Sequence, residues 1–157
     1  MNFFRRVLYK MGVGHEDAGQ SYLRVFLLDD DESRHEWFMK RFAKDQLDIA
    51  KDVGGATSLL SERSYDAIFL DHDLLPEHYN SETTDDERTG YAVALWLALR
   101  QDLQPASTIV VHTRNADGAM RMVAELRRAG RQADYVPFPF FRRESRATGA
   151  GERTLEG

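Results

Sequence analysis

The stretch DAIFLDHDLLPEH, residues 66–78, decides how the whole chain is interpreted. Its apolar run is typical of a strand that is buried on both faces, as in a parallel sheet. The run stops at Asp71, His72 and Asp73, so two carboxylates flank an imidazole where the strand ends. These residue types suit a phosphate-accepting aspartate, a metal site or a histidine catalyst, and the stretch by itself leaves all three open.

Strand-like and helix-like segments alternate along the rest of the chain. Apolar runs predict five strands, at residues 22–30, 47–53, 65–71, 106–113 and 132–138. Helical spacing predicts four helices between them, at residues 31–44, 56–64, 88–101 and 115–130. Alternation of this kind predicts an α/β fold with a parallel sheet, right-handed crossovers and helices on both faces.

Three local predictions go with these elements. Asp31 and Asn115 stand where helix N-caps are expected. Gly54 and Gly55 are interpreted as a turn that precedes the second helix. The buried stripe of the fourth helix is predicted to contain Ala116, Ala119, Met120, Val123 and Leu126.

The length of 157 residues predicts one domain. We expect a helical arm at residues 1–20, the main domain at 21–141 and a flexible polar tail at 142–157. The polar connection at 74–88 is long enough to suggest a functional or disordered loop. No helical pattern follows the last strand, so the fifth helix is expected to be absent or replaced, and we predict that the arm covers that part of the sheet.

Composition excludes several classes of protein. The chain has 21 Lys and Arg against 26 Asp and Glu, a net charge of −5, so no cationic field favours nucleic acid. It has no cysteine, which excludes disulfides and thiolate zinc sites. The longest apolar run, Tyr91–Leu99, is far shorter than the roughly 20 residues of a membrane span. Without a secretory signal pattern, the expected location is the cytoplasm.

Polar clusters follow three of the predicted strands. Beside the cluster at residues 71–73, they are the acidic run at 29–31 and the polar run at 112–115. The carboxyl ends of parallel strands meet at one edge of a sheet, where ligands bind. Because neighbouring strands lie about 4.8 Å apart, we expect His72 and His112 to face one cleft.

The two histidines suit the hydrolysis of a phosphodiester. Such a reaction needs one group that activates water and one that protonates the leaving oxygen. A histidine pKa of about 6.5 leaves both forms populated at neutral pH. We therefore predict His72 and His112 as the acid and base, with Asp71 or Asp73 accepting a ring N–H. An ordinary structural role for either histidine remains an alternative.

Two further sets of residues could hold ligands at this edge. Thr113, Arg114 and Asn115 precede a helix, whose first N–H groups favour an anion, so they are predicted to bind phosphate. In a competing interpretation, the carboxylates of residues 29, 30 and 71 supply hard oxygens for Mg²⁺. Addition of the two histidines would adapt that set to Mn²⁺, Zn²⁺ or Fe²⁺.

Four segments resemble the successive landmarks of bacterial response-regulator receiver domains: VFLLDDDESR, DAIFLDHDLLP, STIVVHTR and ADYVPFPF. The resemblance covers residues 23–141 and implies a flavodoxin-like fold with strand order 2-1-3-4-5. It implies that Asp29 and Asp30 help to hold Mg²⁺. It also makes Asp71 the phosphoacceptor and Thr113 the hydroxyl residue that follows the fourth strand.

The departures from that pattern point to a narrower family. Receivers carry a lysine before the proline that ends the fifth strand, and this chain has Phe138 before Pro139. His72 and His112 stand where apolar residues are usual. The segments LDHDL (70–74) and VHTRN (111–115) resemble those of the cyclic-phosphate-processing receiver domains. That resemblance implies that the two histidines act on cyclic phosphates or related nucleotide-derived phosphoesters.

Three functions are therefore expected as alternatives. The first is a phosphoric-ester hydrolase that acts on a small phosphorylated molecule. The second is an atypical response regulator that takes phosphate on Asp71 from a histidine kinase. The third is a phosphorylation-independent pseudo-receiver that binds a partner protein. No DNA-binding domain is expected to follow the receiver-like region.

Overall fold

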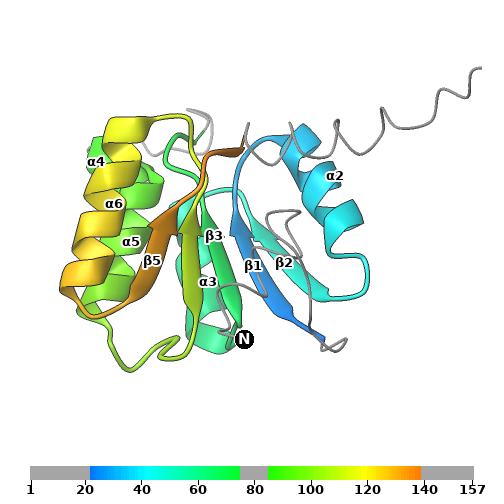
Figure 1. Ribbon diagram of the computed structural model, residues 1–157, viewed down its shortest axis with the longest axis horizontal. Helices are drawn as coiled ribbons and strands as arrows, with labels where there is room; N and C mark the ends of the chain where they lie inside the picture. Colours follow the sequence, from blue (N-terminus) through cyan, green and yellow to red (C-terminus); the bar gives the residue numbers. More distant parts are fainter. Residues whose placement is uncertain (1–21, 75–84, 139–157) are drawn as a thin grey trace, which may run out of the picture.

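The computed structural model describes residues 22–74 and 85–138 (Figure 1). The predicted arm at 1–20, the tail at 142–157 and the predicted absence or replacement of a fifth helix concern residues outside the described ones. Within the described residues, every helix is too short or too polar to cross a lipid bilayer.

In the described part of the chain, five parallel strands form one sheet, and their order is β2-β1-β3-β4-β5 (Figure 1). The strands are β1 (Arg24–Leu28), β2 (Gln46–Ala50), β3 (Ala67–Leu70), β4 (Thr108–Val111) and β5 (Gln132–Tyr135). The predicted flavodoxin-like, receiver-like topology is confirmed. In the register of the three central strands, Leu28 pairs with Leu70 and Leu70 with Val111, so these strands end at one level.

The helices cover the two faces unequally. They are α2 (Glu32–Arg41), α3 (Val53–Glu62), α4 (Asp85–Arg88), α5 (Gly90–Leu99) and α6 (Ala116–Arg128). Side chains of α3, α5 and α6 pack in one core with Leu28, Leu70 and Val111. On the opposite face, α2 packs in a second core with Leu27, Phe69 and Val110. Alternate residues of each central strand therefore point into different cores.

Aromatic rings dominate the core beneath α2. Phe38 is fully buried, and its ring centroid lies 5.1 Å from that of Phe69 and 6.4 Å from that of Phe138. Burial of each such side chain contributes about 1.5–3 kcal/mol relative to exposure. This packing fixes α2 against the carboxyl half of the sheet, where the polar clusters lie.

The two predicted N-caps are present. The Asp31 side chain accepts hydrogen bonds from the backbone N–H groups of Ser33 and Arg34. The Asn115 side-chain oxygen accepts one from the backbone N–H of Gly118, at 2.9 Å. Both caps lie at the carboxyl edge of the sheet, so they also set the direction in which α2 and α6 leave that edge.

Some local predictions were wrong. Gly54 and Gly55 lie inside α3, which begins earlier than expected because Asp52 caps it and bonds the backbone N–H of Gly55. Met120 is 60 % exposed, and Met122 takes its place in the buried stripe of α6. Most of the polar connection at 74–88 lies outside the described residues, and its last part forms the short helix α4, which no apolar spacing predicted.

Candidate functional site

The ends of β1, β3 and β4 bring three polar residues into one row at the carboxyl edge. Asp29, Asp71 and His112 each follow the last residue of their strand, and the strand register places them side by side. All three are buried. Since they follow Leu28, Leu70 and Val111, which point into the core of α3, α5 and α6, their side chains point toward α2.

Asp29 and His112 form a sealed pair within this row. Nε2 of His112 lies 2.7 Å from an Asp29 carboxylate oxygen, and the imidazole is only 1 % exposed. Its ring centroid lies 5.8 Å from that of Phe38. Burial acts to raise the pKa of Asp29, but the hydrogen bonds from His112 and Arg34 outweigh it and hold that pKa well below its usual range.

Asp71 stands in a different electrostatic environment. Burial raises the pKa of its carboxyl group above the usual value, and the nearby charge of Asp29 acts in the same direction. The opposing influences include Arg34 and a hydrogen bond from the hydroxyl of Thr113. The two carboxyl groups therefore differ in protonation behaviour although they lie side by side.

Arg34 contacts both of these carboxylates, although it was not predicted from the sequence as a site residue. Its Nε and Nη2 atoms lie 2.7 and 2.8 Å from the two oxygens of Asp29, and Nη2 lies 3.1 Å from Asp71. A signal was available, because an arginine in the first turn of a helix that follows the acidic run must lie close to that run. Its guanidinium lies 6.0 Å from the ring centroid of Phe138, the residue at the position of the receiver lysine.

His35 is a second residue whose environment was not expected. It is buried, although it lies on a helix that is otherwise rich in charged residues. Its Nε2 atom lies 2.6 Å from the backbone carbonyl oxygen of Asp29. This contact ties the first turns of α2 to the end of β1.

His72 lies on the other side of the sheet, toward α6. Its Nδ1 lies 2.7 Å from a carboxylate oxygen of Asp73, which is 67 % exposed, and 3.4 Å from the side-chain nitrogen of Asn115. Its Nε2 is buried and has no hydrogen-bond partner among the described residues. The ring lies against Gly118, where an added Cβ would come within 2.5 Å of it.

The structure does not provide the shared cleft that was expected for the two histidines. His72 points toward α6 and His112 toward α2, and His112 is sealed between Asp29 and Phe38. The expectation that both imidazoles open onto one pocket is therefore corrected. The physical reason is the strand register, which sets His112 level with Asp71 and leaves His72 one residue further along.

The predicted phosphate residues lie at the start of α6. Thr113 is buried, and its hydroxyl oxygen accepts a hydrogen bond from the backbone N–H of Asn115 at 3.1 Å. The side-chain oxygen of Asn115 is used by the helix cap. Arg114 is exposed, so its guanidinium is the charged group of this set that can reach a phosphate from solvent.

The acidic residues offer the right kind of ligand for a divalent cation, but the space among their oxygens is already occupied. Oxygens of Asp29, Asp30 and Asp71 lie within 4.8 Å of one another, and carboxylate oxygens are the ligands that Mg²⁺ prefers. Arg34, however, already contacts all three of these carboxylates, the longest contact being 3.8 Å to Asp30.

Gly90 allows the start of α5 to lie very close to the backbone of Asp71 and His72. An added Cβ at Gly90 would lie 1.7 Å from the backbone oxygen of Asp71. The backbone N–H of Gly90 also donates a 2.8 Å hydrogen bond to the carbonyl oxygen of His72. From the sequence, Gly90 was predicted only as part of a helix and was given no role. A glycine at the first helical position was the signal that could have indicated this close approach.

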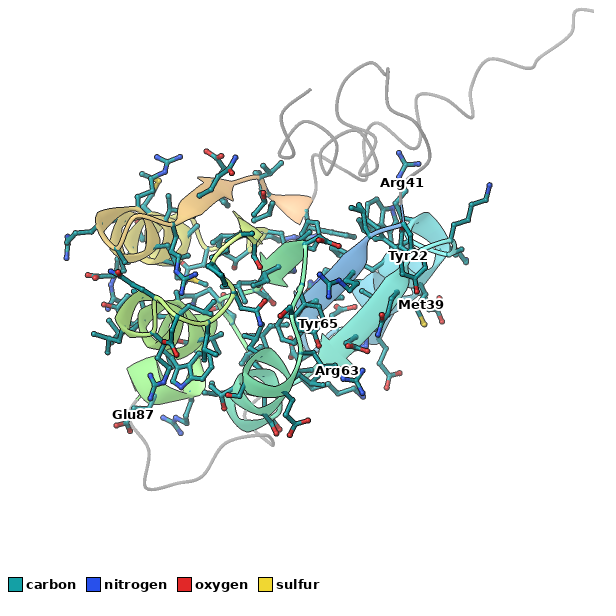
Figure 2. All side chains as sticks on the ribbon, turned by 90° about the horizontal axis from the view of Figure 1, so that it is seen from below. Tyr22, Met39, Arg41, Arg63, Tyr65 and Glu87 are labelled. Carbon is teal, nitrogen blue, oxygen red and sulfur yellow. The ribbon has the colours of Figure 1, made fainter. Side chains whose placement is uncertain are left out.

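The opposite edge of the sheet has a shallow hollow of about 240 Å³. It is lined by Arg24, Gln46, Arg63, Ser64 and Tyr65; Figure 2 labels Arg63 and Tyr65 on this side of the molecule. Arg63 pairs with Asp48 at 3.0 Å, and the Tyr65 hydroxyl donates to the same carboxylate. These polar groups are satisfied within the chain, so the carboxyl edge remains the candidate site.

Comparison with known protein families gives a match over most of the described residues. The family model described as "Cyclic-phosphate processing Receiver domain" matches residues 24–128. None of the curated proteins compared with the chain matches it.

Solved receiver domains share the fold at low sequence identity. A Burkholderia pseudomallei response regulator, described with a phosphorylated aspartic acid, a calcium ion and citrate, is 18 % identical with a TM-score of 0.54, covering 85 % of this chain and 76 % of its own. The Vibrio cholerae chemotaxis protein CheY4 is 15 % identical with a TM-score of 0.57, and the coverage is 82 % and 96 %. A CheY-like receiver domain from Methanospirillum hungatei is 16 % identical with a TM-score of 0.55, and the coverage is 81 % and 99 %. At these identities the likeness establishes the fold alone.

Proposed function

The chain belongs to the family of cyclic-phosphate processing receiver domains, and we propose that it hydrolyses a cyclic phosphate or a related nucleotide-derived phosphoester at the carboxyl edge of its sheet. The observation that carries this proposal is a pair of carboxylate–imidazole contacts on either side of Asp71. Asp73 holds His72 and Asp29 holds His112, each at 2.7 Å. A carboxylate that accepts a ring N–H fixes the tautomer and the orientation of the imidazole.

The two pairs take different roles because they differ in exposure. The His72 ring is buried, but its partner Asp73 is 67 % exposed, whereas both members of the pair of His112 and Asp29 are sealed, so protons can reach His72 from solvent through Asp73. His112 is sealed, so its role is to position Asp29 and thereby the row that contains Asp71. The proposed acid–base centre is thus the pair of His72 and Asp73, and His112 is a positioning residue.

The single pair of His72 and Asp73 is sufficient for both proton transfers of the proposed reaction. Water attacks phosphorus, and the pair of His72 and Asp73 takes the proton that water releases. The bond from phosphorus to one ring-ester oxygen breaks, and the same pair returns a proton to that oxygen. The exposed guanidinium of Arg114, with the first N–H groups of α6, offers positive potential for the phosphate.

The test is turnover of a panel of nucleotide and ADP-ribose cyclic phosphates. We expect His72→Ala to lower kcat by about 10²–10⁴-fold, and Asp73→Asn to lower it by less, because the imidazole remains. Asp102→Asn is the matched control, since Asp102 is an exposed aspartate in the connection before β4, away from this edge. Undiminished turnover in His72→Ala would overturn the assignment.

Phosphorylation of Asp71 is the second candidate function. It is favoured by the position of this carboxylate at the end of β3, where Arg34 and the Thr113 hydroxyl both contact it. Incubation with acetyl phosphate, followed by intact mass measurement, tests it. An adduct that disappears in Asp71→Asn supports a response regulator, whereas the absence of both adduct and turnover supports a pseudo-receiver that binds a partner protein.

A further inference from the structure

We propose that Arg34 is the resident cation of the acidic cluster formed by Asp29, Asp30 and Asp71, and that it competes with divalent metal ions for this cluster. The inference does not depend on the proposed hydrolysis. It concerns how the chain balances three adjacent carboxylates, and it follows from the contacts of one guanidinium group.

The guanidinium occupies the space that a metal ion would need. Nη2 of Arg34 lies 2.8 Å from Asp29, 3.1 Å from Asp71 and 3.8 Å from Asp30. A magnesium ion would bind such oxygens at about 2.1 Å, which would place it almost on the position of Nη2. The guanidinium and a metal ion therefore cannot occupy this position at the same time, so a metal ion can bind only when Arg34 has moved away.

Several contacts hold the guanidinium in place. Its Nε makes a second hydrogen bond to Asp29, so the pair is bidentate. The backbone N–H of Arg34 bonds the cap residue Asp31, which fixes the start of the side chain. The side chain is only 21 % exposed, and a bidentate pair of this kind is stronger than a surface ion pair.

The position of Phe138 explains why the cation comes from α2. Phe138 is buried against Trp37 and Phe38, and no ammonium reaches Asp71 from that position. Arg34 supplies the positive charge from the neighbouring helix instead, and its guanidinium lies 6.0 Å from the Phe138 ring. The chain thus carries its own permanent counter-charge, since arginine does not lose its proton.

Removal of the guanidinium tests the competition. We compare wild type, Arg34→Met and Arg34→Lys, with Arg24→Met as the control. Arg24 also pairs with an aspartate, Asp66, but at the opposite edge of the sheet. The probes are MgCl₂ up to about 10 mM and MnCl₂, and the readouts are the melting temperature and the electron paramagnetic resonance signal of free Mn²⁺.

In wild type we expect little change of the melting temperature on addition of Mg²⁺. Arg34→Met should melt lower without metal, because three adjacent carboxylates then lose the charge of the guanidinium, and Mg²⁺ should restore much of the loss. If Arg34 is in place for nine-tenths of the time or more, the dissociation constant for Mn²⁺ should fall at least about tenfold in Arg34→Met. Arg24→Met should behave as wild type does toward both ions.

Equal Mn²⁺ affinity in wild type and Arg34→Met would overturn the proposal, as would stabilisation of wild type by Mg²⁺ to the same extent. If Arg34→Met does not fold in the presence or absence of metal, Arg34→Lys carries the test. A lysine cannot make the bidentate contact, so its variant should bind Mn²⁺ more tightly than wild type. An unchanged affinity of Arg34→Lys would then refute the competition.

Discussion

The sharpest prediction concerns Gly118, because the space it leaves is filled by the ring of His72. A Cβ added there would lie 2.5, 2.7 and 2.9 Å from three atoms of that ring. Such distances are well inside normal contact, so in Gly118→Ala the imidazole or the first turn of α6 must move. We expect the contact between His72 and Asp73 to be lost or lengthened.

The magnitude follows from two opposing effects. Alanine in place of glycine in a helix stabilises it by up to about 1 kcal/mol, and overpacking of a buried site costs about 1–3 kcal/mol. Gly54→Ala isolates the first effect, since an added Cβ there meets only an Asp52 oxygen at 3.8 Å. Gly118→Ala should therefore be about 1–3 kcal/mol less stable than Gly54→Ala.

Urea unfolding of the two variants measures this difference, and histidine NMR signals report the environment of His72. Under the proposed function, Gly118→Ala should also lose turnover while Gly54→Ala keeps it. If both variants gain the same stability and the His72 signals do not shift, the close approach of Gly118 to the ring is absent and the reasoning fails.

Three further predictions concern the elements around the site. The pKa of Asp29 is lower in the folded chain than its unfolded value of about 3.9. Its contribution to stability is therefore complete above that pH and is lost as pH falls through the folded pKa, so acid unfolding should be shallower in Asp29→Asn; equal pH slopes in urea titrations would contradict this. Phe38→Ala should cost about 3–5 kcal/mol in urea unfolding, because the ring is fully buried, whereas Met39→Ala, at a neighbouring residue that is half exposed, should change stability by less than about 0.5 kcal/mol. Asp31→Ala should lower stability by about 1 kcal/mol through loss of the N-cap, and Asp31→Asn should retain most of it; thermal unfolding that does not distinguish the two would exclude the capping role.

The fold was predictable because each element has a local cause in the sequence. Apolar runs formed the strands, and Asp31 and Asn115 capped helices as their positions predicted. Two departures arose where a short-range hydrogen bond overrides the usual preference of a residue type. Asp52 caps a helix that incorporates Gly54 and Gly55, although two adjacent glycines usually indicate a turn. His35 is polar, but it is buried because it bonds the backbone of Asp29.

The sequence by itself determined that carboxylates and imidazoles gather at one edge, since parallel strands end on the same side. Only the tertiary structure decided which of these groups meet. Within one strand, the alternation of side chains determines which residues share a face of the sheet. Between two strands, the register determines which residues lie on the same face. Leu70 pairs with Val111, so His112 points with Asp71 toward Arg34 and α2, and His72 points toward α6. A shift of the register by one residue would have turned both imidazoles to the same face.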